Sequence, residues 1–421
     1  MIADSFKIYW QTIIKSLIKL EKYVSKENFV GWDPYDGLLA QRIPEKLRRN
    51  NLTGLILIQL NLYSPVNLRP ILNIPKGLSN KSLALFARAY LIMYITFRKS
   101  KYLEKAIKLL RILSSNTNKA CNSYYFPYIA PKHYLGPSIT DIICVTESLK
   151  TYVLAYKLTK NLEYFKLASR MFEILFHQLY VEKGSIAYFK YTPYEQGKIV
   201  FNVSALALEA SAHFLSLKEN KENINIRELY MDKLSKVVLF LISHQSNNGA
   251  WSYSYYLNEN KYYWQIDYHQ GFIIDGLNAI LSLVSNKYLR DLVRGGLEKA
   301  INFYMCKQFT REGASYYRYP IRYPIDIHNQ AQGIITFSKL YRATEKEEYL
   351  NQAIKIALWT IKNMQDPQGY FYAHHWGIFR NKIPYMRWSQ AWMMLALSEL
   401  LYTLKATLLN DNRMRSGVIL Y

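Results

Sequence analysis

The sequence predicts an all-α fold, an (α/α)6 toroid with short aromatic extended loops at one rim. A motif recurs about every sixty residues, each copy begins a helix rich in small and apolar residues, and an amphipathic helix follows all copies but the last. The copies begin at Lys81, Asp141, Asn202, Asp267, Asp326 and Arg387. Repeats of this length indicate a closed or stacked array of one supersecondary unit. Six copies therefore predict six inner helices whose first residues share a rim.

The third repeat shows the unit most clearly. Its inner helix, NVSALALEASAHFLSL, is apolar at helical spacing, and its Ala and Ser residues allow close packing on several sides. Its outer helix, RELYMDKLSKVVLFLISHQ, has Lys and Asp on one face and Leu, Val and Phe on the other. The NNG that follows stops the helix, because Gly accepts a left-handed C-cap. Aromatic residues at alternating positions come next, so we expect a short strand or hairpin there and in the three matching loops.

The domain organisation follows from the same pattern. We expect an N-terminal helix and extended segments over residues 1–80, the toroid over 81–405, and a polar tail over 406–421. The last inner helix has no outer partner after it, and the helix near residues 5–25 has none before it. Pairing these two helices would close the ring. No linker interrupts the chain, and no apolar run approaches the eighteen residues of a membrane span.

The amino-acid composition limits the classes of molecule that we expect the protein to bind. The formal charge is +23, which suits an acidic polysaccharide, an anionic membrane surface or nucleic acid. No nucleic-acid-binding motif occurs, so specific nucleic-acid binding is disfavoured. The alternative is that the lysines form only a solvated surface. Three cysteines without metal spacing, and an amphipathic N-terminal helix in place of a signal peptide, favour a reducing, cytoplasmic location.

Two neighbouring repeats carry the candidate catalytic residues. Asp267 and His269 begin one inner helix, and Asp326 and His328 begin the next at the same spacing. Asp is a favoured N-cap, so capping alone explains the carboxylates, and shared repeat ancestry alone would explain the histidines. The functional alternative is that these side chains turn into a central cavity. A helix N-terminus disfavours a protonated imidazole, so a neutral His there is suited to proton abstraction near pH 7.

The rim also carries the candidate substrate-binding residues. Arg387 could hold a carboxylate with two parallel hydrogen bonds, and Trp388 could stack on a sugar ring or belong to the core. Further candidates come from the aromatic loops and the other helix starts: Tyr385, Asn202, Asp141, Trp251 and Tyr317. We expect neither a metal nor a cofactor, because no phosphate loop, zinc motif or dinucleotide fingerprint occurs. The adjacent His374 and His375 are a poor metal arrangement by themselves.

Two N-terminal segments stand out from the repeats. GWDPYDGL holds Asp33 and Asp36 around a proline-containing turn, and SPVNLRP holds Arg69 in an extended stretch. We expect turn chemistry for the first segment and a buried ion pair for Arg69, with a functional role as the alternative for both.

These phrases, together with IDYHQGF and YMRWSQAWMMLALSEL, resemble a family of α/α-toroid proteins associated with bacterial and archaeal polysaccharide biosynthesis. The resemblance spans residues 31–403 and implies a toroid that handles a glycan, without implying a mechanism. The layout is more distantly similar to six-hairpin glycosidases, to uronate lyases and epimerases, and to terpenoid cyclase toroids. Where such relatives would carry a WG…DW segment, this chain has YYFPYIAPKHYLGPS, which puts in doubt any activity that depends on that wall.

Three function hypotheses remain open. The leading one is a carbohydrate-active enzyme of polysaccharide biosynthesis that acts on an acidic glycan. It would act either as a lyase or epimerase using the histidines, or as a hydrolase using Asp267 and Asp326. The second is a non-catalytic glycan-binding or scaffold protein. The third, an isoprenoid-handling toroid, is disfavoured because no aspartate-rich DDxxD or DxDD motif occurs. The oligomeric state cannot be derived from the sequence.

Overall fold

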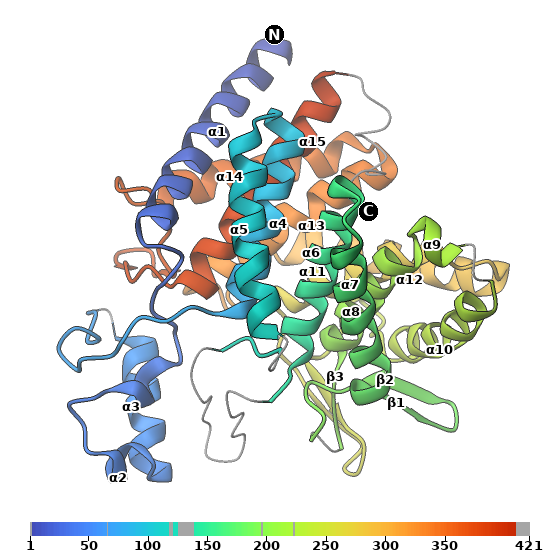
Figure 1. Ribbon diagram of the computed structural model, residues 1–421, viewed down its shortest axis with the longest axis horizontal. Helices are drawn as coiled ribbons and strands as arrows, with labels where there is room; N and C mark the ends of the chain where they lie inside the picture. Colours follow the sequence, from blue (N-terminus) through green and yellow to red (C-terminus); the bar gives the residue numbers. More distant parts are fainter. Residues whose placement is uncertain are drawn as a thin grey trace.

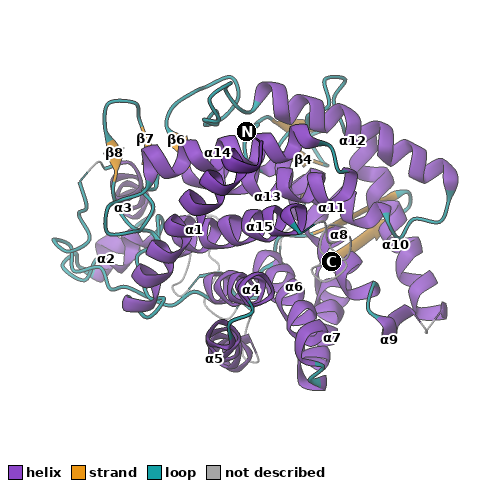
Figure 2. Cartoon of the chain, turned by 90° about the horizontal axis from the view of Figure 1, so that it is seen from above, coloured by secondary structure: helices purple, strands orange, loops and turns teal. Residues whose placement is uncertain are grey.

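Six inner helices form a closed ring. In this computed structural model, which describes residues 2–64, 66–117, 121–124, 139–194, 197–221 and 224–409, each inner helix packs on the next and the last packs on the first. They are α4 (Asn80–Phe97), α6 (Ile142–Thr159), α8 (Phe201–Leu215), α11 (His269–Leu281), α13 (Ile327–Thr344) and α15 (Ala391–Leu408). Each begins within four residues of its predicted start. The predicted fold class is confirmed (Figures 1 and 2).

Six outer helices surround the ring. They are α1 (Ile2–Lys26), α5 (Ser100–Thr117), α7 (Leu162–Ile174), α10 (Ile224–Ser243), α12 (Lys287–Lys307) and α14 (Glu347–Met364). Helix α1 packs against both α14 and α15, so the N-terminal helix is the outer partner that the last repeat lacks. Its Ile13, Leu17, Leu20 and Val24 are fully buried at helical spacing. The first outer helix and the last inner helix therefore lie side by side where the ring closes (Figure 2).

Three small antiparallel sheets lie at the end where the inner helices begin. A hairpin joins β1 (Tyr180–Lys183) and β2 (Ile186–Phe189), while β3 (Lys198–Val200), β4 (Ser254–Tyr256) and β5 (Lys261–Tyr263) form the second sheet. The third sheet contains β6 (Ile325–Asp326), β7 (His374–His375) and β8 (Arg380–Asn381). β3 directly precedes α8, and β6 directly precedes α13. The aromatic loop at 311–320 forms isolated bridges without a named strand among its described residues.

The N-terminal segment after α1 forms a separate lobe beside the ring (Figure 1). It contains the short helix η1 (Asp36–Leu39), α2 (Glu45–Arg48) and α3 (Asn51–Tyr63). The predicted ion pair exists: Arg69 Nε donates to Asp36 Oδ1 at 2.8 Å, and both side chains are fully buried. Because burial disfavours the charged carboxylate, the pKa of Asp36 rises to about 6 despite the nearby Arg69.

The remaining elements are short. Helix α9 (Lys218–Lys221) lies between α8 and α10, and two π-helical turns, η2 (Leu175–Leu179) and η3 (Met386–Gln390), extend α7 and precede α15. Part of the predicted 406–421 tail belongs to α15, and residues 410–421 lie outside the described residues. The YYFPYIAPKHYLGPS segment also lies outside them, except for Tyr124.

Buried charged side chains cross the middle of the ring. Glu147 accepts from Arg88 at 2.6 Å and lies 2.9 Å from Lys150 Nζ, which also contacts Glu209 at 2.6 Å. Lys339 pairs with Glu209 and with Asp275, and Arg342 pairs with Glu399 at 2.8 Å.

Two larger cavities lie on opposite sides of this network. One of about 830 Å³ opens where the inner helices begin, and one of about 730 Å³ opens where they end.

Candidate functional site

The 830 Å³ cavity lies at the rim that the repeat starts predict. Five of the predicted site residues line it: His269, His328, Asn202, Arg387 and Trp388. Equivalent positions of successive repeats share a rim, so these side chains converge although their sequence positions differ by up to 186 residues, from Asn202 to Trp388. The volume falls within the range of pockets that hold small-molecule ligands.

Asp267 holds His269 in place. One carboxylate oxygen accepts from the His269 backbone N–H at 3.1 Å and also contacts the ring nitrogen Nδ1. The other oxygen accepts from Gln265 Nε2 at 2.7 Å. A carboxylate on one imidazole nitrogen fixes the ring orientation and leaves Nε2 available for another partner. Asp267 itself is buried and does not line the cavity, so it acts on the cavity through His269.

His328 stands among aromatic rings with both ring nitrogens unsatisfied. Its imidazole stacks on Tyr268 with centroids 4.1 Å apart and contacts Trp392 at 4.8 Å and Trp388 at 4.9 Å. Neither Nδ1 nor Nε2 has a hydrogen-bond partner among the residues that the structure describes. Burial, with smaller contributions from Lys81 and His269, holds the pKa of His328 well below its usual range. The ring is therefore neutral at pH 7.

Tyr268 connects the two histidines. Its ring centroid lies 4.1 Å from that of His269 as well as 4.1 Å from that of His328. Burial raises the pKa of the Tyr268 hydroxyl well above its usual range, with Asp267 adding to the effect. The phenol therefore stays neutral and keeps its proton at any physiological pH.

Lys81 is a buried basic residue that lines the same cavity, and the sequence did not mark it as a candidate site residue. Its Nζ lies 5.1 Å from the centroid of Trp392, the ring that also contacts His328. Burial and the nearby Arg387 lower its pKa to about 7. Lys81 is the start of the first repeat, equivalent to Asp267 and Asp326. The repeat alignment contains the signal for it, although that copy carries no other polar residue typical of a site.

Arg387 lines the cavity, but its guanidinium is already engaged. Nε and Nη2 donate to the two carboxylate oxygens of Asp33 at 2.5 and 2.9 Å. Asp33 comes from the N-terminal segment, in the GWDPYDGL motif. The two parallel hydrogen bonds that a substrate carboxylate would need are thus satisfied within the chain. We therefore assign Arg387 to the wall of the site, where it fixes the N-terminal segment against η3, the turn that precedes α15.

Asp326 links α13 to the last repeat. Its carboxylate accepts from the His328 backbone N–H at 2.8 Å, as a helix cap, and from Trp388 Nε1 at 3.1 Å. His374 Nε2 lies 3.5 Å from its second oxygen. Asp326 therefore both caps the helix and orients Trp388, whose indole lines the cavity. The N-terminal segment adds Tyr35, whose ring meets Trp388 edge to face at 6.1 Å.

The other predicted binding residues divide into two groups. Asn202 lines the cavity, and its Oδ1 has no hydrogen-bond partner within the described part of the chain. Asp141, Trp251 and Tyr385 are fully buried, and Tyr317 is half-buried; none of the four lines the cavity. Asp141 caps α6 and accepts from Ser123, while Trp251 donates to Leu241 O at 2.7 Å. Tyr385 packs in a small core cluster, where burial raises its pKa to about 12.

Aromatic rings and cations form the upper wall. Tyrosines from the rim loops line the cavity, and they include Tyr191, Tyr253, Tyr256 and Tyr263. Lys198 Nζ lies 5.4 Å from the centroid of Tyr253, and the Arg318 guanidinium lies 5.1 Å from that of Tyr317. Four lining side chains are cationic, against one carboxylate, Glu147. Within the described residues, no group of three or more His, Cys, Asp or Glu side chains is placed to hold a metal ion.

Comparison with known proteins supports the fold. No protein-family model matches the chain, and no curated protein matches its sequence. Among solved structures, the cellobiose 2-epimerase of Bacillus thermoamylovorans is similar with a TM-score of 0.56 at 14% identity, covering 78% of this chain and 90% of the epimerase. A D-mannose isomerase gives a TM-score of 0.55 at 15% identity, with 77% and 87% covered.

A GH76 α-mannanase of Bacteroides thetaiotaomicron is also similar. Its TM-score is 0.59 at 12% identity, and the match covers 81% of this chain and 90% of the mannanase. These likenesses confirm the expected relation to six-hairpin toroids, and at this identity they show the fold alone. No helix among the described residues is both long and apolar enough to cross a membrane.

Proposed function

We propose that this chain is a carbohydrate-modifying enzyme that moves a proton on a sugar carbon, as an epimerase or isomerase does. One observation carries the proposal: two imidazoles meet in an aromatic cavity of about 830 Å³. His328 is neutral with unsatisfied nitrogens, and His269 is oriented by Asp267. That pairing of a base with an oriented acid is what proton transfer at carbon requires.

The proposed chemistry uses each group in turn. A carbonyl or carboxyl group on the sugar acidifies the hydrogen on the neighbouring carbon. His328 takes that proton, and the electron pair of the broken C–H bond moves onto the carbonyl oxygen. The Lys81 ammonium stabilises the resulting oxyanion. In an epimerase, His269 then gives a proton from Nε2 back to the same carbon from the other side. In an isomerase, His269 gives that proton to the former carbonyl carbon, and the proton of the neighbouring hydroxyl passes to the oxyanion as that hydroxyl becomes the new carbonyl. Both histidines regain their starting states through solvent.

The lining of the cavity supports a sugar as the substrate. Tyrosine and tryptophan rings present flat apolar faces with polar tips, which suits a pyranose ring. Two proteins of similar fold are a cellobiose 2-epimerase and a D-mannose isomerase, and an α-1,6-mannanase of Salegentibacter was solved with α-1,6-mannotetrose. Lys81, Lys198 and Arg318 favour an acidic sugar over a neutral one, and polysaccharide biosynthesis would supply such a substrate.

Hydrolysis by Asp267 and Asp326 is the alternative that the mannanase likeness favours. Both carboxylates are held by backbone and side-chain donors, and neither lines the cavity. This arrangement supports the histidines as the groups that meet substrate. A glycan-binding protein without chemistry would use the same aromatic wall, so the test must separate all three functions.

Deuterium exchange at sugar carbons tests the proposal whatever the product is. The protein is incubated in D₂O with cellobiose, D-mannose and uronate oligosaccharides, and proton NMR follows loss of each C–H signal. We expect one sugar to exchange next to its carbonyl or carboxyl group. His328→Phe keeps the ring stack but removes both nitrogens, so the exchange rate should fall by roughly 10²- to 10⁴-fold.

His244→Phe is the matched control, because His244 also packs among aromatic rings but lies outside the cavity. Its exchange rate should equal that of the parent. Release of new reducing ends without C–H exchange, lost in Asp267→Asn, would show a hydrolase instead. Saturable binding with neither reaction would establish the glycan-binding alternative.

A further inference from the structure

Helix α3 exposes an apolar face that the described residues leave largely uncovered. Gly54, Ile58 and Asn61 are buried at a spacing of three and four residues, so they face the rest of the lobe. The opposite face carries Leu52, Leu55, Ile56, Leu60 and Tyr63, which are 42% to 67% exposed. We call these five residues the α3 apolar face. Part of it forms a groove of about 580 Å³.

This face departs from the rule for surface helices. An outward-facing helix surface normally carries charged side chains, yet no Asp, Glu, Lys or Arg occurs between Asn51 and Tyr63. Each leucine removed from water would contribute about 1.5–3 kcal/mol. Exposed apolar surfaces of this kind mark sites of interaction with a protein or a membrane.

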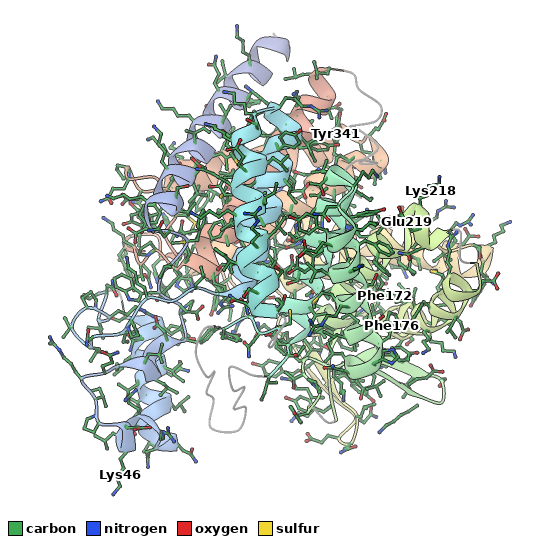
Figure 3. The ribbon with its side chains drawn as sticks, in the orientation of Figure 1. Lys46, Phe172, Phe176, Lys218, Glu219 and Tyr341 are labelled. Carbon is green, nitrogen blue, oxygen red and sulfur yellow. The ribbon has the colours of Figure 1, made fainter. Side chains whose placement is uncertain are left out.

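Charge around the helix indicates which partner it meets. Between residues 37 and 80 the chain has six basic residues and one acidic residue, Glu45. Arg42, Lys46 and Arg49 are exposed near the start of α3, and Arg49 pairs with Glu45 at 2.5 Å. Figure 3 shows Lys46 at the far tip of the lobe, directed away from the ring. An apolar face beside exposed cations complements the anionic headgroups and acyl chains of a bilayer surface.

The lobe lies on the same side of the molecule as the mouth of the cavity. In Figure 1, α2 and α3 extend to the lower end, where the β4–β5 hairpin also lies and where the inner helices begin. That rim carries further exposed apolar side chains, including Trp264 and Ile378. Tryptophan at the edge of an apolar surface is typical of the membrane–water interface.

We propose that the α3 apolar face docks on an anionic membrane surface and so turns the cavity mouth toward the membrane. With thirteen residues, α3 is about 20 Å long, too short to cross a hydrocarbon core of about 30 Å. It therefore lies in the plane of the interface, with its leucines among the acyl chains and Arg42 and Lys46 at the headgroups. A second copy of this chain is the less suitable occupant, because it would bring the same basic residues together.

Vesicle flotation of the full chain tests this inference independently of any activity. We expect the parent protein to float with vesicles of phosphatidylcholine and phosphatidylglycerol, and to remain unbound with phosphatidylcholine alone. Leu55→Glu combined with Leu60→Glu should lower the affinity about tenfold or more. Arg42→Gln combined with Lys46→Gln should lower the affinity about tenfold, and added salt should weaken the binding of the parent protein to anionic vesicles.

Leu162→Glu is the matched control, since Leu162 is a leucine exposed to 62% on the outer helix α7. That variant should bind vesicles as the parent does, and circular dichroism should show all variants folded. Equal binding of the parent and the Leu55/Leu60 variant would overturn the proposal, as would equal binding to neutral vesicles. A dimer of the parent that the Leu55/Leu60 variant loses, without vesicle binding, would instead assign the face to a second copy.

Discussion

Lys81 shows how one buried charge can serve a site while costing stability. Its ammonium sits among Trp392, Arg387 and His328, and burial lowers its pKa from an ordinary value of 10.5 to about 7. Packing alone does not explain a lysine here, because a methionine would fill the same space without the cost of burying a charge. An amine that titrates near neutral pH can both stabilise an oxyanion and lose its proton during a reaction.

Replacing Lys81 with Met should stabilise the protein in a pH-dependent way. Between about pH 7 and 10.5 the unfolded chain holds a proton that the folded protein lacks, so the stability of the parent rises with pH across that window. The free energy of unfolding of Lys81→Met should therefore exceed that of the parent by a few kcal/mol near pH 6–7, and the difference should shrink as the pH approaches 10. Urea unfolding of both proteins at a series of pH values measures the difference.

Exposed Lys46 provides the control for this measurement. Water already solvates its ammonium, so the stability difference between Lys46→Met and the parent should stay the same at every pH. A Lys81→Met difference that also stays constant with pH would contradict the buried-charge assignment.

Individual contacts explain what could be predicted of the site. Equivalence between repeats located His269, His328, Asn202 and the rim itself, because repeat geometry follows from spacing alone. The pairing of Asp33 with Arg387 joins residues 354 positions apart and belongs to no repeat. No periodicity in the chain reports such a contact. The same limit hid Tyr35, whereas Arg69 could be anticipated because an isolated Arg in an extended apolar stretch needs a carboxylate partner.

At the scale of elements, the repeat pattern predicted the helices correctly where their packing is regular. Inner helices are surrounded by protein, so small residues and polar caps mark them clearly. Helix α3 shows the opposite case, since its apolar residues follow no single stripe and the sequence predicts extended segments in that region. β3 and β6 were also missed as separate strands, because each pairs with a loop from a different repeat.

The contact between α8 and α11 depends on a glycine. A Cβ at Gly276 would lie 2.2 Å from the backbone oxygen of Ala205, so the helices must move apart to accept any side chain. Gly276→Ala should therefore lower the free energy of unfolding by roughly 1–3 kcal/mol, as overpacking does. Urea denaturation measures this change.

Gly295 in α12 is the matched control, because a Cβ there meets nothing within 4 Å. Gly295→Ala should stabilise the protein by about 0.4–1 kcal/mol, since alanine restricts the unfolded chain and favours helix. If Gly276→Ala stabilised the protein to a similar extent, the close approach of α8 and α11 would be refuted.

At the scale of the whole molecule, charged side chains join apolar ones in closing the centre of the ring. Arg88, Lys150 and Lys339 meet Glu147, Glu209 and Asp275 in a network that separates the two cavities. Both cavities are lined by cations, so the charge of +23 is not confined to the mouth that bears Arg387. The composition predicted a basic protein, but only the fold shows where the carboxylates gather.

Glu209 is the side chain on which this network depends. It contacts both Lys150 and Lys339, and although burial opposes ionisation, the two ammonium groups hold the pKa of Glu209 well below its usual range. Glu209→Gln removes the negative charge that both ammonium groups, Lys150 and Lys339, pair with at this position. The variant should lose roughly 3–5 kcal/mol of stability at pH 7, as when one partner of a buried ion pair is removed. Thermal and urea unfolding measure the loss.

The contribution of Glu209 to stability should also depend on pH, and an exposed glutamate provides the control. Because the folded pKa of Glu209 lies below the unfolded one, its contribution is present above about pH 4.5 and disappears as the pH falls through the folded value. The gap between parent and Glu209→Gln should thus persist from pH 7 to 5 and narrow in stronger acid. Glu182→Gln removes an exposed partner of Lys236 and should change stability little. If the two variants lost equal stability, the central charges would contribute no more than surface pairs, and apolar packing alone would have to hold the ring closed.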